Sequence, residues 1–254
     1  MQSISLAMIL SLITTVISVV FAVMVLLRWR GALKEGKQRP HLRAWGIGLT
    51  LYAIGAFSQV VLSFVWSPLF FGLWYWTGAL ATAPWLGQGT VYLLIRRGNI
   101  ARNIEMALIL VCVMTLPWML LLTPMNGAAW QPGVDMNVIL HQVLQPDKSR
   151  SAFVGAMNGW GTVALVGGAI YSSILFGRKK ILRSRMVGNW LIAAGGLLPA
   201  LGGALVSLNL VQFNYVGIML GVILIFLGYM QTANATDDAR VPPSQRAASE
   251  TAGR

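Results

Sequence analysis

Residues 5–27 read SLAMILSLITTVISVVFAVMVLL, and residues 28–43 continue as RWRGALKEGKQRPHLR. The first stretch contains no ionisable side chain and is longer than the roughly 20 residues that a helix needs to cross the hydrocarbon core of a bilayer. The second stretch contains six Lys or Arg residues. An apolar run followed by basic residues is typical of a membrane-spanning helix whose basic end lies in the cytoplasm.

The same kind of apolar run recurs along the whole chain. It predicts an all-α, multi-pass membrane protein with seven spans, over residues 5–27, 44–66, 69–95, 106–123, 152–177, 186–210 and 213–233. Only 10% of the 254 residues are charged, whereas a soluble domain usually has about 25%. The composition therefore excludes a soluble enzyme, a disordered protein and a disulfide-stapled secreted domain.

The basic residues predict how the chain is threaded. All of the 19 Lys and Arg residues except Lys148 and Arg150 fall in the segments 28–43, 96–102, 178–185 and 237–254. The positive-inside rule then places the N-terminus outside and the C-terminus in the cytoplasm, with the first span uncleaved. Because the net charge of +12 is divided among four short segments, we expect the bilayer as the partner and no nucleic acid.

The predicted domain plan is a transmembrane domain over residues 1–236 and a polar, Pro-containing, disordered tail over residues 237–254. Spans one to three run in the same directions as spans five to seven, which allows a parallel 3+1+3 repeat. This plan is similar to that of sugar-efflux carriers of the SWEET type and of rhodopsin-like bundles. The chain contains no Pro-Gln dipeptide and no Lys in its seventh span, so no functional residue is transferred from either group.

The predicted spans contain none of the groups on which membrane enzymes and pumps usually depend. The acidic residues all fall outside them, with Glu105 at the cytoplasmic mouth of the fourth span, and His41 and His141 lie in loops on opposite sides. Cys112 is the only cysteine and lies in an apolar stretch, where a thiol is usually inert. We therefore expect no catalytic residues, no metal site and no cofactor.

Uncharged polar and aromatic residues instead follow one face of the second and third spans. The candidate ligand-binding residues are Tyr52, Gln59, Thr82, Trp85 and Gln88. If the two spans pack antiparallel, Gln59 lies at the depth of Thr82, and Tyr52 at the depth of Gln88. These side chains either join helix to helix by hydrogen bonds or line a pocket.

Three further features concern motion, assembly and the outer surface. Pro199, among glycines in the middle of the sixth span, predicts a hinge. Small-residue pairs such as Gly155 with Gly159 suit a homo-oligomer or a protein partner, although internal packing uses them equally. The outer segment 124–150 exceeds the usual connection length, and residues 134–144 within it predict a short helix at the interface.

These observations favour a non-enzymatic membrane protein, either a sensor-type bundle or an accessory subunit of a membrane complex. The alternative is a facilitative transporter or channel for a small uncharged or apolar compound, which the polar stripe and the predicted hinge suggest. Compact loops and the absence of targeting signals predict a prokaryotic cytoplasmic membrane as the location.

Overall fold

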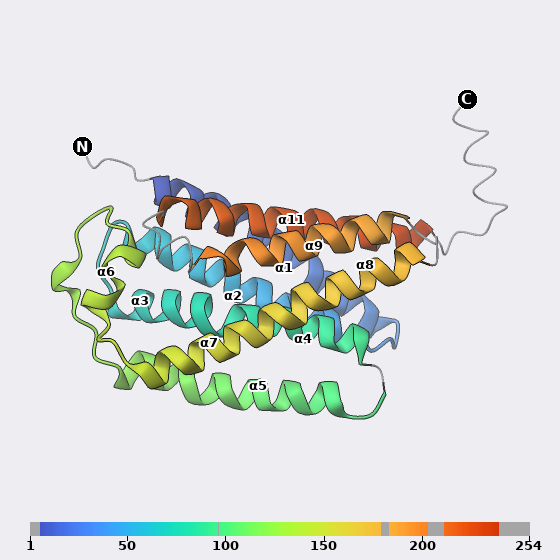
Figure 1. Ribbon diagram of the computed structural model, residues 1–254, viewed down its shortest axis with the longest axis horizontal. Coiled ribbons are helices and arrows are strands. Elements are labelled where there is room, and N and C mark those ends of the chain that lie inside the picture. The colour runs from blue at the N-terminus through green and yellow to red at the C-terminus, as the bar shows by residue number, and fades with distance from the viewer. Residues whose placement is uncertain (1–5, 96, 179–182, 203–210, 239–254) are drawn as a thin grey trace.

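The computed structural model describes residues 6–95, 97–178, 183–202 and 211–238, and within these ranges the regular elements are helices that form an elongated bundle (Figure 1). The α-helices are α1 (Leu6–Lys34), α2 (Pro40–Leu62), α3 (Pro68–Tyr75), α4 (Thr82–Leu94), α5 (Ile100–Pro117), α6 (Met136–Val143), α7 (Lys148–Thr162), α8 (Gly168–Arg178), α9 (Arg183–Ala200) and α11 (Val211–Asp238). The π-helical segments are η1 (Trp76–Ala81), η2 (Trp118–Leu122) and η4 (Val163–Gly167), and η3 (Gly127–Ala129) is a 3₁₀ turn.

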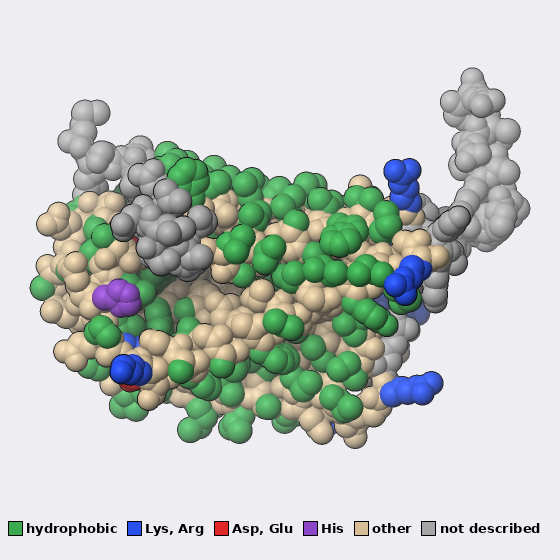
Figure 2. All heavy atoms as spheres, in the orientation of Figure 1, with side chains coloured by type: hydrophobic (Ala, Val, Ile, Leu, Met, Phe, Trp, Pro, Cys, Tyr) green, Lys and Arg blue, Asp and Glu red, His purple; other side chains and the backbone are tan. Residues whose placement is uncertain are grey.

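Five helical segments in the described ranges are long and apolar enough to cross a membrane. They are Leu6–Lys34, Pro40–Leu62, Ile100–Leu122, Lys148–Arg178 and Phe213–Ala233. Apolar side chains cover much of the flank of the bundle between its two ends (Figure 2), as expected for a surface in contact with lipid. The predicted all-α class is confirmed for these residues, with five candidate membrane-spanning helices.

Of the other two predicted spans, one is divided into three helical segments and the other is described only in part. The predicted span 69–95 corresponds to α3, η1 and α4, which follow one another without interruption from Pro68 to Leu94. The predicted span 186–210 corresponds to α9, but residues 203–210 lie outside the described residues. Of the predicted disordered tail 237–254, Asp237 and Asp238 are helical and end α11, and residues 239–254 lie outside the described residues.

Glycines bring α9 and α11 into direct backbone contact. A Cβ atom added to Gly188 would lie 2.7 Å from the carbonyl oxygen of Gly228, and one added to Gly195 would lie 2.6 Å from that of Gly221. These small faces therefore serve packing within the bundle. The predicted pair on α7 differs, because a Cβ on Gly155 or Gly159 would meet no atom within 4 Å.

Two apolar clusters form the interior of the bundle. The inner cluster includes Phe21, Leu49, Ile192, Val222 and Tyr229. The outer cluster joins α3 and α5 to α6 through the buried residues Met136, Ile139 and Val143, and α6 confirms a helix within residues 134–144. The candidate site lies between the two clusters.

Candidate functional site

A cavity of about 280 Å³ lies inside the bundle, close to the lower size limit of small-molecule sites. Its walls come from α1, α2, α3, η1, α4, α6, α7, η4, α9 and α11. The polar and aromatic side chains among its lining residues are Ser11, Thr14, Tyr52, Gln59, Trp74, Tyr75, Thr77, Thr82, Asn137, Asn158, Thr162, Asn214 and Tyr215. None of the lining residues in the described part of the chain is charged.

The cavity exists because small residues and altered helical turns meet at one level. Gly55, Gly78 and Gly196 line it together with several alanines; a Cβ on Gly78 would meet no atom within 4 Å, whereas one on Gly55 would lie 2.6 Å from the Thr77 hydroxyl, so only Gly78 leaves open space. The π-helical segments η1 and η4 also border it, through residues such as Thr77 and Leu165. A π-helical turn changes the direction in which later side chains point, and such turns are frequent at functional sites.

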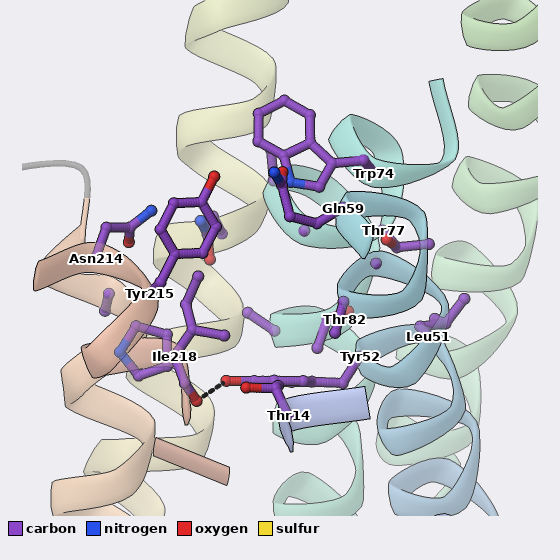
Figure 3. Close-up of a pocket in the computed structure, with 18 of the residues that line it drawn as sticks. Thr14, Leu51, Tyr52, Gln59, Trp74, Thr77, Thr82, Asn214, Tyr215 and Ile218 are labelled. Atoms are coloured by element: carbon purple, nitrogen blue, oxygen red, sulfur yellow. Dashed lines mark hydrogen bonds between the residues drawn. The ribbon is translucent and has the colours of Figure 1, made fainter. Parts of the chain in front are cut away.

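Several polar groups in the wall already have a partner on the protein. The Tyr52 hydroxyl donates to the backbone carbonyl of Ile218 on α11 at 2.6 Å (Figure 3). The Thr14 and Thr77 hydroxyls donate to carbonyls four residues earlier in their own helices, at 2.7 and 2.8 Å. These three hydroxyl groups therefore have a hydrogen-bond acceptor on the protein and do not require a ligand.

Gln59 and Thr82 differ from these residues. Gln59 is only 2% exposed, and neither its Nε2 nor its Oε1 has a hydrogen-bond partner among the residues the structure describes. The Thr82 hydroxyl is unpaired in the same sense. Figure 3 shows the Gln59 and Trp74 side chains extending from the α2 and α3 side of the cavity towards Tyr215 on α11. A buried polar group without a partner costs free energy, so it calls for an explanation.

The outer end of the cavity is covered by α6, which is tied to α11 through a polar cluster. The Asp135 carboxylate caps α6 by accepting from the backbone N–H of Asn137 at 2.8 Å, and it also accepts from the Tyr215 hydroxyl at 2.8 Å. Burial raises the pKa of the Asp135 carboxyl above its ordinary value, although these hydrogen bonds oppose the shift. Asn137 and Leu140 of α6 form part of the cavity wall.

The other end of the cavity is closed by the inner cluster. Leu86, Leu165 and Ile225 belong both to the cavity wall and to this cluster. Among these side chains a second space, lined by residues such as Phe21, Trp45 and Tyr229, measures about 10 Å³, which is no more than one water molecule requires. In the described part of the chain the site therefore ends at the inner cluster.

The candidate residues of the sequence prediction divide into two groups. Tyr52, Gln59 and Thr82 line the cavity, as does the predicted hinge residue Pro199. Trp85 and Gln88 lie apart from it, because their side chains turn towards α5.

The contacts of that second group are specific. The Trp85 indole N–H donates to the Cys112 sulfur at 3.4 Å, and the Gln88 amide donates to the Ala101 carbonyl at 2.6 Å. The expected pairing of Tyr52 with Gln88 is therefore not present, since the Tyr52 hydroxyl is bonded to α11 and the Gln88 amide to α5.

The structure also shows an ion pair that the sequence analysis did not predict. Helix α5 begins at Ile100, before the predicted span 106–123, so Glu105 lies within the helix, and its side chain is only 4% exposed. Both of its carboxylate oxygens accept from the Arg43 guanidinium of α2, at 2.7 and 2.9 Å, and the Tyr92 hydroxyl donates to it at 2.5 Å. This ion pair, in which Glu105 is buried and Arg43 is partly exposed, joins α2 and α5, and the Tyr92 hydrogen bond adds α4.

Sequence reasoning missed the contribution of the later helices to the cavity. Asn214 and Tyr215 open the last apolar run, and Asn158 interrupts the fifth, so a polar residue at the edge or middle of an apolar run was the available signal. No cluster of three or more His, Cys, Asp or Glu side chains suited to a metal ion occurs among the described residues. No family model, curated protein or solved structure matches this chain.

Proposed function

We propose that this chain is a non-enzymatic, sensor-type membrane protein that binds a small, uncharged molecule in the cavity between α2, η1 and α11. The observation that supports this proposal most directly is the unpaired, buried amide of Gln59 in the cavity wall. A side chain whose only role is to join two helices forms a hydrogen bond with the neighbouring helix. The Gln59 amide forms none with the described residues, and its polar atoms are covered by protein, so we infer that a ligand pairs with it after the side chain turns into the cavity.

The topology proposed for this function has seven crossing helices. To the five long segments it adds α3–η1–α4 and the segment that begins with α9. The C-terminal ends of α1, α4 and α8 lie at the end of the bundle opposite α6 (Figure 1), and the sequence segments 28–43, 96–102 and 178–185 contain 14 of the 19 Lys and Arg residues. This distribution supports a cytoplasmic location for that end. In this orientation α6 and the cavity lie on the outer side of a prokaryotic cytoplasmic membrane.

A matched pair of glycine substitutions tests the proposal. Gly78 lines the cavity, and a Cβ at this position would meet no atom within 4 Å, so Gly78→Leu fills the cavity without a steric clash at its first carbon. Gly155→Leu is the control, because Gly155 is equally open and lies outside the cavity wall.

The measurement compares wild type and both variants after gentle purification from their own membranes. Mass spectrometry of the extracted small molecules should find one stoichiometric compound in the wild type and in Gly155→Leu, and a strongly reduced amount in Gly78→Leu. The proposal is wrong if Gly78→Leu retains the same compound at the same stoichiometry. A stoichiometric partner chain without a small molecule would instead indicate an accessory subunit.

A facilitative transporter is the second candidate, and Pro199 is the observation that favours it. Pro199 lies in the cavity wall close to the end of α9, and a proline within a membrane helix provides a point of bending. Transport also requires the inner cluster to open. Proteoliposomes that release a preloaded compound faster than protein-free liposomes would favour this candidate over the sensor.

A further inference from the structure

The proposed function leaves the chemical class of the ligand open. The side chains of the cavity wall indicate which class of ligand fits. The wall contains no charged side chain among the described residues, while Trp74, Tyr75 and Tyr215 contribute aromatic surface. A charged ligand in such a site loses its hydration without gaining an opposite charge. The wall therefore suits a neutral ligand with an apolar body.

The buried hydrogen-bonding groups that lack a partner among the described residues indicate the head of the ligand. Tyr52 and Tyr215 each donate their hydroxyl proton to an acceptor on the protein. The Gln59 amide retains both its N–H donors and its carbonyl acceptor, and the Thr82 hydroxyl is also unpaired. A primary amide presents its donor and its acceptor side by side, so its natural complement is a group with the same two functions on adjacent atoms.

We infer that the cavity takes a small neutral molecule with a flat apolar body and a carboxamide- or lactam-type head, which pairs with the Gln59 amide through two hydrogen bonds. This inference rests on the proposed function, and it deepens it by naming the chemical class of the ligand. The alternative is a purely apolar ligand that leaves the Gln59 amide unpaired.

Three probes of nearly equal shape separate these possibilities. 4-Ethylbenzamide offers a donor and an acceptor, 4-ethylacetophenone offers only the acceptor, and 4-ethylbenzoate is charged. Binding is measured by equilibrium dialysis against protein in lipid nanodiscs, with the uptake by protein-free nanodiscs subtracted. Wild type, Gln59→Leu and Thr82→Val are compared. Thr82→Val keeps the shape of the side chain, so it provides the test if Gln59→Leu folds poorly.

The wild type should bind the benzamide roughly tenfold more tightly than the acetophenone, and the benzoate least. Gln59→Leu should weaken benzamide binding by roughly tenfold to a hundredfold, which corresponds to the loss of two net hydrogen bonds. It should leave acetophenone binding within a few-fold of wild type. Thr82→Val should weaken benzamide binding several-fold.

Several outcomes would overturn the inference. These are absence of benzamide binding to the wild type, equal binding of the benzamide and the acetophenone, benzoate binding as tight as the benzamide, or an unchanged benzamide preference in Gln59→Leu. The proposed function is judged separately, by the compound that co-purifies with wild type but not with Gly78→Leu. If that compound is found and has no amide-type head, the site remains and only its ligand class is wrong.

Discussion

Replacement of Gln59 by Leu is expected to stabilise the protein in the absence of ligand. Gln59 is almost fully buried, and neither polar atom of its amide has a partner among the described residues. Leaving such a group unsatisfied costs about 1–3 kcal/mol. Leu has a similar volume and no polar atom, so Gln59→Leu should raise the free energy of unfolding by about that amount.

The assay is thermal unfolding of purified, ligand-free protein in one detergent, followed by circular dichroism. For a domain of this size, each kcal/mol shifts Tm by about 2–4 °C, so the expected increase for Gln59→Leu lies between about 2 and 12 °C. Tyr52→Phe is the matched control from the same helix and the same cavity wall. Because the Tyr52 hydroxyl donates to the Ile218 carbonyl at 2.6 Å, its removal should cost about 0.5–1.5 kcal/mol and lower Tm.

The two variants therefore shift Tm in opposite directions if the cavity account is correct. A Gln59→Leu variant that melts below wild type would refute the reasoning. That result would mean that the amide joins two helices by hydrogen bonds, which is the structural alternative for this polar stripe and is worth about 0.6 kcal/mol per bond.

Three other substitutions test separate parts of the structure. Arg43→Met should lower the free energy of unfolding by about 3 kcal/mol, because it leaves the buried Glu105 carboxylate without its cation. Adding Glu105→Leu should recover most of the lost Tm. A double variant that is no more stable than Arg43→Met alone would contradict this explanation. Gly188→Ala should cost about 1–3 kcal/mol, since its Cβ would lie 2.7 Å from the Gly228 carbonyl oxygen, and an unchanged Tm would argue against the close contact of α9 with α11. Burial raises the pKa of Asp135, so the charged carboxylate is less favourable in the folded than in the unfolded protein, and the stability of the wild type should fall as the pH rises from about 4 through the raised pKa. Asp135→Asn does not titrate at this position, so its Tm relative to that of the wild type should increase from pH 4 to pH 7. A relative Tm that decreases over this range would contradict the raised pKa.

The amino-acid sequence was sufficient to predict the helical class and the outer helix. Long apolar runs lead directly to helices, and residues 134–144 correctly predicted α6. The boundaries were harder, because hydropathy ends a span at the first charged residue. Helix α5 begins at Ile100, before the predicted span, and its Glu105 pairs with Arg43, a partner 62 residues earlier in the chain.

The candidate site was only partly predictable, and η1 shows why. On a regular α-helix, Trp74 and Gly78 share a face with Trp85 and Gln88. The π-helical turn Trp76–Ala81 adds a residue to the turn, so Trp74, Gly78 and Thr82 line the cavity, while Trp85 and Gln88 turn to α5. Nothing in the local spacing of this segment indicated the additional residue.

The remaining walls come from residues that are distant in the sequence. Asn137, Asn158 and Tyr215 reach the cavity from α6, α7 and α11. Each is one polar residue beside or within an apolar run, and only the packing of the helices brings them together. A single sequence contains no signal for such a meeting point.

The central claim is that Gln59 faces a cavity that receives a small neutral molecule. A crystal structure of protein purified from its own membranes and crystallised in a lipid phase tests it most directly. The account predicts electron density for a small molecule between α2 and α11, within hydrogen-bonding distance of the Gln59 amide. A cavity closed by the surrounding helices, with both polar atoms of Gln59 bonded to protein groups, would contradict it.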